Sequence, residues 1–259
     1  MLRAGLTSVT FRNLDFYEII KYCKECNISA IEWGSDVHAP IDDEENALKI
    51  KTECDKAEII VSSYGTYYKC GKYEDSEREF LKYIKIAKIL GAPTMRIWVG
   101  EKNYEEANTQ YIEKIVSELK MICDLAKKEN IQIGCELHGG TLCNNRENSL
   151  EIVKRVDKDN FGMYFQYDWN FSVDDNCKTL ESFLPMLKNV HVFNIVREDS
   201  GIKRLSVGEE KGKEMWKRFA GILKANKVDA TLLFEFLADP TKDYLKNEAM
   251  VLNDIIKNS

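Results

Sequence analysis

The sequence predicts an α/β fold, a (β/α)8 or TIM barrel, as a single domain over residues 1–259. Apolar runs alternate with amphipathic stretches eight times along the chain. Strands that alternate with helices require right-handed crossovers and form a parallel sheet. Eight such units in 259 residues match the size of a closed barrel. No linker and no shift in composition marks a second domain.

Strands are predicted where short apolar runs occur. They cover residues 2–8, 28–34, 58–66, 93–99, 131–137, 161–167, 190–195 and 230–236. Helical patterns lie between them, at 14–26, 43–57, 76–90, 108–129, 144–157, 177–188, 212–226 and 240–257. In 108–129 the apolar residues recur at spacings of three and four, which lays one stripe against a sheet. A doubly wound open sheet is the alternative, but the segment after the first strand, SVTFRN, lacks a Gly-rich phosphate turn.

Composition and charge narrow the class of protein. Hydrophobic residues form 44 % of the chain, enough for a large core, and the net charge is −6. An acidic chain has no global field that attracts nucleic acid or an anionic membrane. The chain shows neither an apolar run of membrane-spanning length nor a signal peptide, so we expect a cytoplasmic protein. The eight cysteines are then expected to be reduced, and the Cys23–Cys26 pair to serve helix packing.

Polar residues gather where the predicted strands end, which is where barrel enzymes carry their chemistry. In strand order these are Glu32 and His38, Ser63 and Tyr64, Arg96, Glu136 and His138, Gln166 and Asp168, His191, Asn194 and Arg197, and Glu235. All three histidines of the chain are among them. Residues two apart on a strand share a side, so Glu136 and His138 point the same way. Two carboxylates, an imidazole and an amide on the last four strands form a set that suits Mg²⁺ or Mn²⁺, with Zn²⁺ or Co²⁺ as alternatives.

Each of these residues also has a purely structural interpretation. Glu136 or Glu32 could form an ion pair with Arg96, and His191 could be a hydrogen-bonded core histidine. Asp168 could cap the turn before Trp169. Their joint occurrence on consecutive strand ends favours a functional site.

The chain resembles the xylose-isomerase-like (β/α)8 barrels, grouped as sugar phosphate isomerases and epimerases, along its whole length. The matching segments are AIEWGSDVHAP (30–40), SSYGTYY (62–68), MRIWVG (95–100), ELHGGTL (136–142), HVFN (191–194) and FEF (234–236). The resemblance implies one divalent metal ion bound by Glu136, the strand-six position, His191 and Glu235. It also implies a substrate pocket lined by Glu32, His38, Tyr64, Arg96, His138 and Arg197. Family members are often dimers or tetramers, so it allows a homo-oligomer.

The strand-six position departs from the family, which has an aspartate there followed three residues later by histidine. This chain reads Gln166-Tyr-Asp-Trp169. We align Gln166 with the aspartate and keep Asp168, which has the same parity, as the alternative ligand. The set then carries two formal negative charges instead of three.

The resemblance implies an isomerase or epimerase of a small carbohydrate, sugar derivative or cyclitol, with Glu136 and Glu235 exchanging a proton beside a carbonyl through an enediolate. The alternatives are a lyase or dehydratase on a related polyol, and a sugar-binding barrel without catalysis. DNA-repair endonucleases share the barrel but use a histidine-rich trinuclear zinc site, which three histidines and an acidic chain do not fit.

Overall fold

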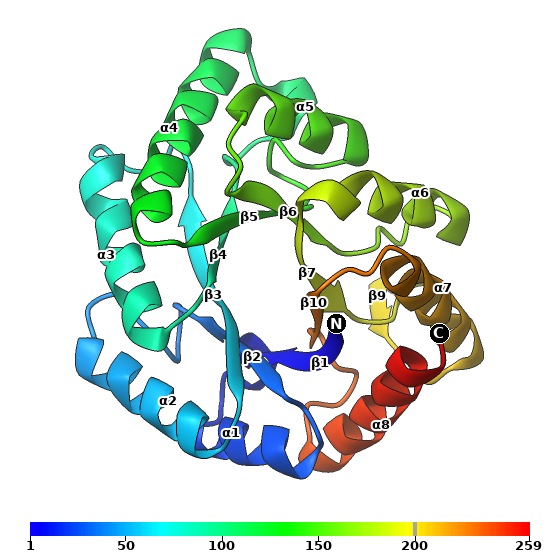
Figure 1. Cartoon of the computed structure of the whole chain (residues 1–259). Helices are drawn as coiled ribbons and strands as arrows, with labels where there is room; N and C mark the ends of the chain where they lie inside the picture. Colours follow the sequence, from blue (N-terminus) through cyan, green and yellow to red (C-terminus); the bar gives the residue numbers. More distant parts are fainter. Residues whose placement is uncertain (199–200) are drawn as a thin grey trace.

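The computed structural model describes residues 1–198 and 201–259 and contains a closed parallel barrel with helices around it (Figure 1). Around the barrel the strand order is β1-β10-β7-β6-β5-β4-β3-β2. The strands are β1 (Leu2–Thr7), β2 (Ala30–Gly34), β3 (Ile60–Lys69), β4 (Thr94–Trp98), β5 (Gln132–Glu136), β6 (Phe161–Phe165), β7 (Leu187–Val192) and β10 (Ala230–Phe234). The predicted (β/α)8 barrel is confirmed.

The eight α-helices that the described residues form lie outside the barrel. They are α1 (Phe16–Glu25), α2 (Glu44–Lys56), α3 (Ser76–Leu90), α4 (Thr109–Lys128), α5 (Arg146–Val156), α6 (Val173–Phe183), α7 (Glu210–Ala225) and α8 (Lys242–Asn258). Short 3-10 turns occupy Ser8–Phe11, Tyr104–Glu106 and Leu184–Met186. Most α-helices begin at an Asp, Asn, Ser or Thr whose side chain accepts a backbone N–H; Asp15 and Glu18 form a complete capping box on α1.

The prediction for residues 177–188 was wrong in position. Helix α6 begins at Val173, because the Ser172 side chain accepts the Asp175 N–H and caps it. It ends at Phe183 because Pro185 cannot continue a helix. Strand β7 therefore starts at Leu187, three residues before the predicted 190.

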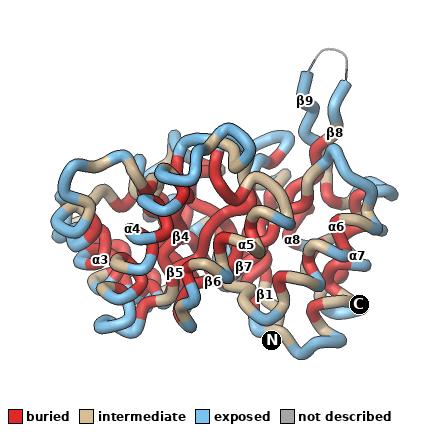
Figure 2. Tube along the Cα trace, turned by 90° about the horizontal axis from the view of Figure 1, so that it is seen from above, coloured by how far each residue is buried: buried red, intermediate tan, exposed pale blue. Residues whose placement is uncertain are grey.

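The segment after β7 holds an element that the sequence reading missed. Strands β8 (Ile195–Glu198) and β9 (Gly201–Arg204) pair antiparallel as a hairpin outside the barrel. It stands out from the rest of the chain at the end opposite the N-terminus (Figure 2). Because β7 runs from the N-terminal to the C-terminal end of the barrel, the hairpin lies where the catalytic groups of such barrels are found.

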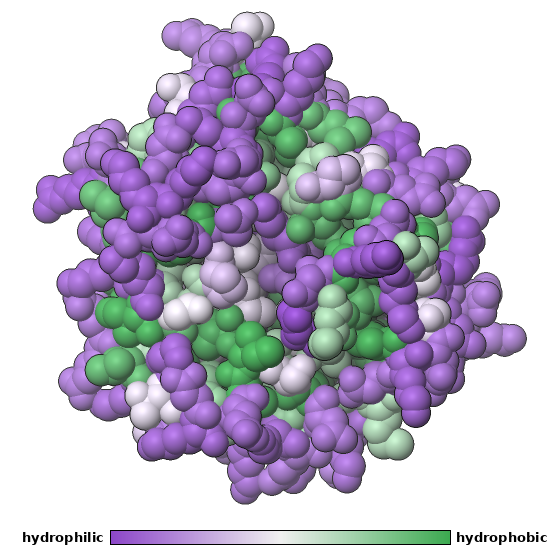
Figure 3. Space-filling view, viewed as in Figure 1, coloured by the Kyte–Doolittle hydropathy of each residue, from purple (hydrophilic) through white to green (hydrophobic). Residues whose placement is uncertain are grey.

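Burial follows the two layers of the fold. Side chains between strands and helices and inside the barrel are buried, and the loops and outward helix faces are exposed (Figure 2). In the view of Figure 1, hydrophilic residues cover the rim (Figure 3). All eight cysteines are buried and free of disulfides. Among the described residues, no helix combines the length and apolarity that crossing a membrane demands.

Inside the barrel, glycine at one strand position makes room for a large side chain of the next strand. A Cβ on Gly134 would lie 2.4 Å from the ring of Tyr164. The Tyr164 hydroxyl meets the Asn189 amide at 3.2 Å, and that amide also reaches Ser63 Oγ at 3.4 Å. This packed polar layer forms the floor beneath the site.

Candidate active site

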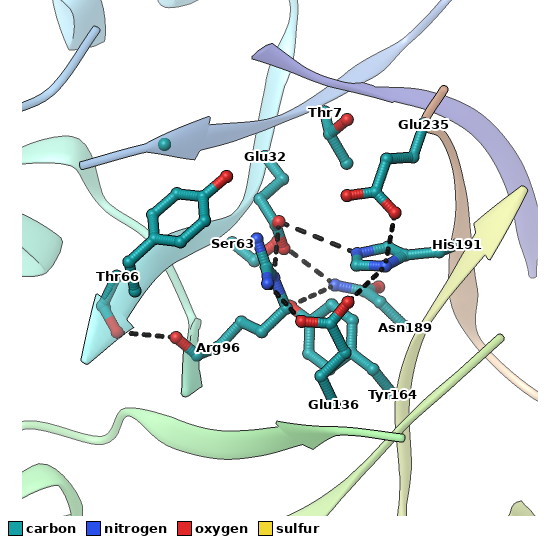
Figure 4. Close-up of polar contacts among 12 residues, drawn as sticks. Thr7, Glu32, Ser63, Thr66, Arg96, Glu136, Tyr164, Asn189, His191 and Glu235 are labelled. Atoms are coloured by element: carbon teal, nitrogen blue, oxygen red, sulfur yellow. Dashed lines mark hydrogen bonds and ion pairs between the residues drawn. The ribbon is translucent and has the colours of Figure 1, made fainter. Parts of the chain in front are cut away.

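Arg96, on β4, forms the buried centre of a charge cluster inside the barrel (Figure 4). Its Nε lies 2.9 Å from Glu32 Oε1, and its Nη1 lies 2.6 Å from Glu136 Oε2. Arg96 is 2 % exposed, Glu32 1 % and Glu136 3 %. Buried charges at this depth are tolerated only when paired. The structural interpretation of Arg96 as an ion-pair partner therefore holds for both glutamates.

The pairing sets the protonation of both carboxyl groups. Burial acts to raise the pKa of Glu32, but the charge of Arg96, with His191 and Ser63, outweighs it and lowers that pKa to about 2. Burial likewise opposes ionisation of Glu136, yet Arg96 and His191 hold its pKa well below the usual range. Both side chains are therefore carboxylates at neutral pH.

Gly65, on β3, is needed for this arrangement. A Cβ at position 65 would lie 2.9 Å from Arg96 Nη2 and 2.9 Å from Glu32 Oε1. Any other residue would therefore push the two charged groups apart. The glycine inside the SSYGTYY segment is thus part of the site.

His191, on β7, lies on the other side of Glu136 and is fully buried. Its Nδ1 is 3.3 Å from Glu235 Oε2, 3.6 Å from Glu136 Oε1 and 3.2 Å from Gln166 Oε1. Although burial opposes protonation, Glu235, Glu136 and Glu32 raise the pKa of His191 well above its usual value. Three side-chain oxygens thus surround His191 Nδ1. They belong to Glu136, Gln166 and Glu235, at the carboxyl ends of β5, β6 and β10.

This group fits a divalent metal ion. One ligand atom each of Glu136, His191 and Glu235 lies within 4.8 Å of the others. Ligands about 2.1 Å from one ion are separated by about 3.0–3.4 Å at octahedral or tetrahedral angles, close to the distances found around Nδ1. Glu235 Oε2 is buried without a hydrogen-bond partner among the described residues, as is His191 Nε2. The charged neighbour of that oxygen is His191 Nδ1, 3.3 Å away. A divalent cation in the gap would replace the imidazole proton as the positive charge beside it.

The second nitrogen of His191 faces a second carboxylate. Its Nε2 lies 3.8 Å from Glu32 Oε1. Metal-binding histidines regularly direct their other N–H toward a carboxylate, which fixes the ring and the tautomer. Glu32 is positioned for that supporting role and binds Arg96 at the same time.

Gln166, not Asp168, is the strand-six residue that reaches the cluster. The Gln166 Nε2 donates to the Leu137 carbonyl at 2.6 Å, which turns Oε1 toward His191. Asp168 Oδ1 instead accepts the Asn170 backbone N–H at 2.8 Å and closes the turn before the α6 segment. The structural interpretation of Asp168 as a turn cap agrees with this geometry.

Replacing Gln166 with aspartate is expected to tighten binding of Mg²⁺ or Mn²⁺ by about 10-fold or more, since added ligand charge raises affinity for hard cations. In the metal-free protein the change adds a negative charge beside Glu136 and Glu235, so chelation should lower the melting temperature more than in the wild type. Equilibrium dialysis and thermal unfolding with and without EDTA measure both effects. If Asp168→Asn removes the metal and Gln166→Asp changes nothing, Asp168 is the ligand.

His138 lies at the edge of the cluster beside Trp98. The two rings stack with centroids 5.0 Å apart, and Trp98 Nε1 donates to Glu136 Oε2 at 2.5 Å. The Nδ1 of His138 lies 2.5 Å from the Gly139 carbonyl, which can only accept, so Nδ1 carries the proton. The other nitrogen, Nε2, is therefore the unprotonated one in the neutral ring.

A cavity of about 410 Å³ opens above these residues. Glu136, His138 and Gln166 form one side of it. The remaining wall includes Asn144, Trp169, Phe193, Ile202, Arg204 and Phe236. The volume suits a ligand of small-molecule size.

Of the six predicted substrate contacts, only His138 lines this cavity. Glu32 and Arg96 lie in the buried charge cluster, whereas His38, Tyr64 and Arg197 lie elsewhere. The ring nitrogens of His38 form hydrogen bonds with Ser8 Oγ and the Leu14 carbonyl, both at 3.1 Å. His38 therefore stabilises the loop that carries it. Tyr64 points outward, because its neighbours Ser63 and Gly65 point inward, and its hydroxyl donates to the Ala39 carbonyl at 2.7 Å. Neither side chain is brought to the cluster. Arg197 is exposed on the hairpin and is not part of the cavity wall.

Several site residues were not predicted. Trp98 donates to the Glu136 carboxylate. Ser63, which the sequence placed at a strand end without a role, donates from Oγ to Glu32 Oε2 at 2.8 Å. Trp98 could have been found by strand parity, since it lies two residues after Arg96. Trp169 lies two residues beyond the predicted strand 161–167, and Phe236 is the last residue of the predicted strand 230–236, so both carried a comparable signal. The sequence offers Arg204 only as one of three candidate phosphate clamps, with Arg96 and Arg197. Its position beside the cavity could not be predicted, because the hairpin that carries it was not predicted.

The fold and the site define a (β/α)8 barrel with acidic and histidine side chains that converge on a metal-sized gap at the carboxyl ends of its strands. The chain belongs to the xylose isomerase-like TIM barrel family, which it matches over residues 20–255. The family resemblance seen in the sequence is confirmed.

The relatives with assigned activities are enzymes. A 3-dehydroshikimate dehydratase of Bacillus anthracis is 23 % identical over 98 % of this chain and 97 % of its own length. The structure of a probable 3-DHS dehydratase of petrobactin synthesis from the same organism has a TM-score of 0.78 at 19 % identity, covering 97 % and 98 % of the two chains. A D-allulose 3-epimerase from Methylomonas sp. has a TM-score of 0.73 at 14 % identity, covering 99 % and 97 %.

One structural match was solved with a metal ion. It is a xylose isomerase-like TIM barrel protein from Mycobacterium smegmatis in complex with magnesium, with a TM-score of 0.71 at 12 % identity over 98 % of this chain and 97 % of that one. Because these solved structures share only 12–19 % sequence identity with this chain, they show a common fold and nothing more specific.

Proposed function

We propose that this protein is a divalent-metal-dependent enzyme that moves a proton next to a carbonyl group of a small polyhydroxylated substrate, and that it eliminates water. The observation that carries the proposal is the buried gap between His191 Nδ1, Glu136 and Glu235, where a Glu235 carboxylate oxygen accepts no hydrogen bond from the described residues. Glu136, Gln166, His191 and Glu235 are the proposed ligands. They would hold a divalent ion, which would supply Lewis-acid stabilisation of the negative charge that develops on a substrate oxygen.

The environment of Glu136 favours elimination over epimerisation. A two-base epimerase needs one group that removes a proton and a second that returns one. Glu136 Oε2 accepts from both Arg96 and Trp98, and the low pKa of the side chain makes it a poor proton carrier. It is therefore better suited to hold a cation than to shuttle a proton.

His138 is the proposed base. Its Nε2 is unprotonated in the neutral ring, and its side chain lines the cavity. It takes the proton from the carbon next to the carbonyl, and that electron pair forms a C=C bond as the neighbouring C–O bond breaks. The proton then passes to the leaving hydroxide, so the substrate divides into an unsaturated product and water. The full-length similarity to a 3-dehydroshikimate dehydratase supports this reaction class.

A second candidate is the isomerase or epimerase of a small carbohydrate that the sequence predicts. Its geometric support is that Glu136 and Glu235 both lie within 3.6 Å of His191 Nδ1, so two carboxylates surround one reaction point. Exchange of solvent deuterium into recovered ketose, without an unsaturated product, identifies this reaction. Elimination instead yields a conjugated product with new ultraviolet absorbance.

Replacing His138 with asparagine is expected to lower kcat by about 10²- to 10⁴-fold, the usual worth of a positioned general base. Metal content should stay at the wild-type level, because His138 is not among the ligands. Turnover of cyclic and open-chain polyhydroxy ketones by the Mn²⁺-loaded protein provides the assay, with Asn170→Ala as a cavity-wall control. A His138→Asn variant with full activity would remove His138 from the mechanism and return proton transfer to the glutamates.

A further inference from the structure

The hairpin β8–β9 presents two different faces. Its register places Ile195 opposite Arg204 and Arg197 opposite Ile202, so these four side chains share one face. Three of them, Ile195, Ile202 and Arg204, line the cavity. This face is therefore the one directed toward the site.

The two faces of the hairpin differ in whether their positive charges are paired. On the outer face, Lys203 Nζ lies 3.2 Å from Glu198 Oε1, and the two charges neutralise each other. On the inner face, Arg204 makes no ion pair with any residue that the structure describes. Its guanidinium lies over the ring of Phe236, 5.1 Å from the centroid, and is the one permanent positive charge among the described residues of the cavity wall.

Hydrogen bonds hold the base of the hairpin in place. Ile195 N donates to the Tyr167 hydroxyl at 2.6 Å, and Leu205 N donates to the Asn194 carbonyl at 2.8 Å. Asn194 Nδ2 also donates to the Ser206 carbonyl at 2.7 Å. Arg204 lies one residue from this anchored base, so its backbone position is fixed by the barrel.

Phe236 holds its ring under Arg204 at a conformational cost. Its φ of +56° lies in the left-handed region, which is unfavourable for an aromatic residue, and it directly follows Glu235. Strain of this kind persists where the surroundings impose it and clusters at functional sites. The ring and the guanidinium thus form a flat, cationic wall beside the metal gap.

Resting on the proposed function, we infer that the substrate is a carboxylated ring compound whose carboxylate binds Arg204 while its hydroxyl and carbonyl groups face Glu136, His138 and Gln166. A planar guanidinium matches a carboxylate in shape and charge. The apolar side chains Phe236, Ile202 and Phe193 suit a carbon ring. A phosphate ester is less suited, because a dianion usually takes several donors or a nest of backbone N–H groups, and the described wall offers one guanidinium.

Three matched probes test the assignment by calorimetry: quinate, a carboxylated cyclic polyol; myo-inositol, an uncharged one; and myo-inositol 1-phosphate. We expect quinate to bind the wild-type protein at least about 10-fold more tightly than myo-inositol, and Arg204→Gln to weaken quinate binding about 10- to 100-fold, as loss of a hydrogen bond to a charged group does. Inositol binding should change less than about twofold, because it does not use the charge. Lys203→Gln, on the outer face of the same hairpin, is the control and should alter neither.

Equal losses in Arg204→Gln and Lys203→Gln would overturn the inference, as would quinate binding no tighter than inositol binding or no quinate binding in the millimolar range. Tighter binding of the inositol phosphate, lost in Arg204→Gln, would overturn the carboxylate assignment in favour of a phosphate ester. The readout is binding and needs no turnover. Quinate binding through Arg204 in a protein without elimination activity would refute the proposed function alone. Elimination from an uncharged polyol, unaffected by Arg204→Gln, would refute this inference alone.

Discussion

Replacement of Arg96 by methionine is expected to lower the free energy of unfolding by about 3–5 kcal/mol, because removing one partner of a buried ion pair leaves uncompensated charge. Here two carboxylates, Glu32 and Glu136, would lose their counter-charge at once. Domains of this kind are stable by only about 5–15 kcal/mol, so the variant should be partly unfolded at 37 °C. Urea unfolding followed by circular dichroism measures the change.

The controls for Arg96 separate buried from surface charge. Arg218 pairs with Asp174 on the surface, where both side chains are largely exposed. Arg218→Met should therefore cost less than about 1 kcal/mol. Adding Glu32→Gln to Arg96→Met removes one of the stranded charges and should recover part of the loss. An unchanged urea midpoint in Arg96→Met would show that the pair contributes no stability.

The second large effect is expected at Glu235. Glu235→Gln keeps the shape of the side chain but removes the charge, and we expect divalent metal to bind at least about 100-fold more weakly, beyond the 10- to 100-fold typical of outer partners. Activity should be lost with the metal. Metal content by inductively coupled plasma mass spectrometry and Mn²⁺ binding by equilibrium dialysis measure the effect.

This variant is not expected to damage the fold. Without metal, Glu235→Gln removes a carboxylate that pairs with His191 Nδ1 at 3.3 Å, so in EDTA it should melt somewhat below the wild type but remain folded, because Glu32 and Glu136 keep their pairing with Arg96. Asp239→Asn, in the exposed loop that follows, is the matched control and should bind metal normally. If Glu235→Gln retains full metal content, the gap beside His191 is not the metal site.

Strand and helix order could be predicted because each element buries one regular apolar stripe or run. The limits of α6 could not be set by apolar spacing, since the cap at Ser172 and the break at Pro185 are local and polar. The hairpin was missed because its strands are only four residues each, lie outside the barrel and carry mostly exposed side chains. The hairpin therefore lacks the alternation of buried apolar and exposed polar residues by which a strand is recognised in a sequence.

The site residues also divide into those whose positions the sequence could predict and those whose positions it could not. Glu136, Gln166, His191 and Glu235 could be placed together because parallel strands bring their carboxyl ends to one edge. The sequence did not fix which alternate residues of β3 point inward, because a bulge shifts the register of β3 against β2 between Ile31 and Glu32. The outward direction of Tyr64 could therefore not be predicted. His38 lies in a loop, whose course depends on contacts such as those with Ser8 and Leu14 that no spacing encodes.

The ion pairs of Arg96 also bear on the order in which the protein matures. Two of the three carboxylates around the barrel axis already have an internal counter-ion, so the polypeptide does not depend on an external cation to complete its core. Newly synthesised chains should reach the native barrel before metallation, and a chelator should yield a folded apoprotein. That behaviour is the opposite of small zinc domains, in which binding and folding are a single event.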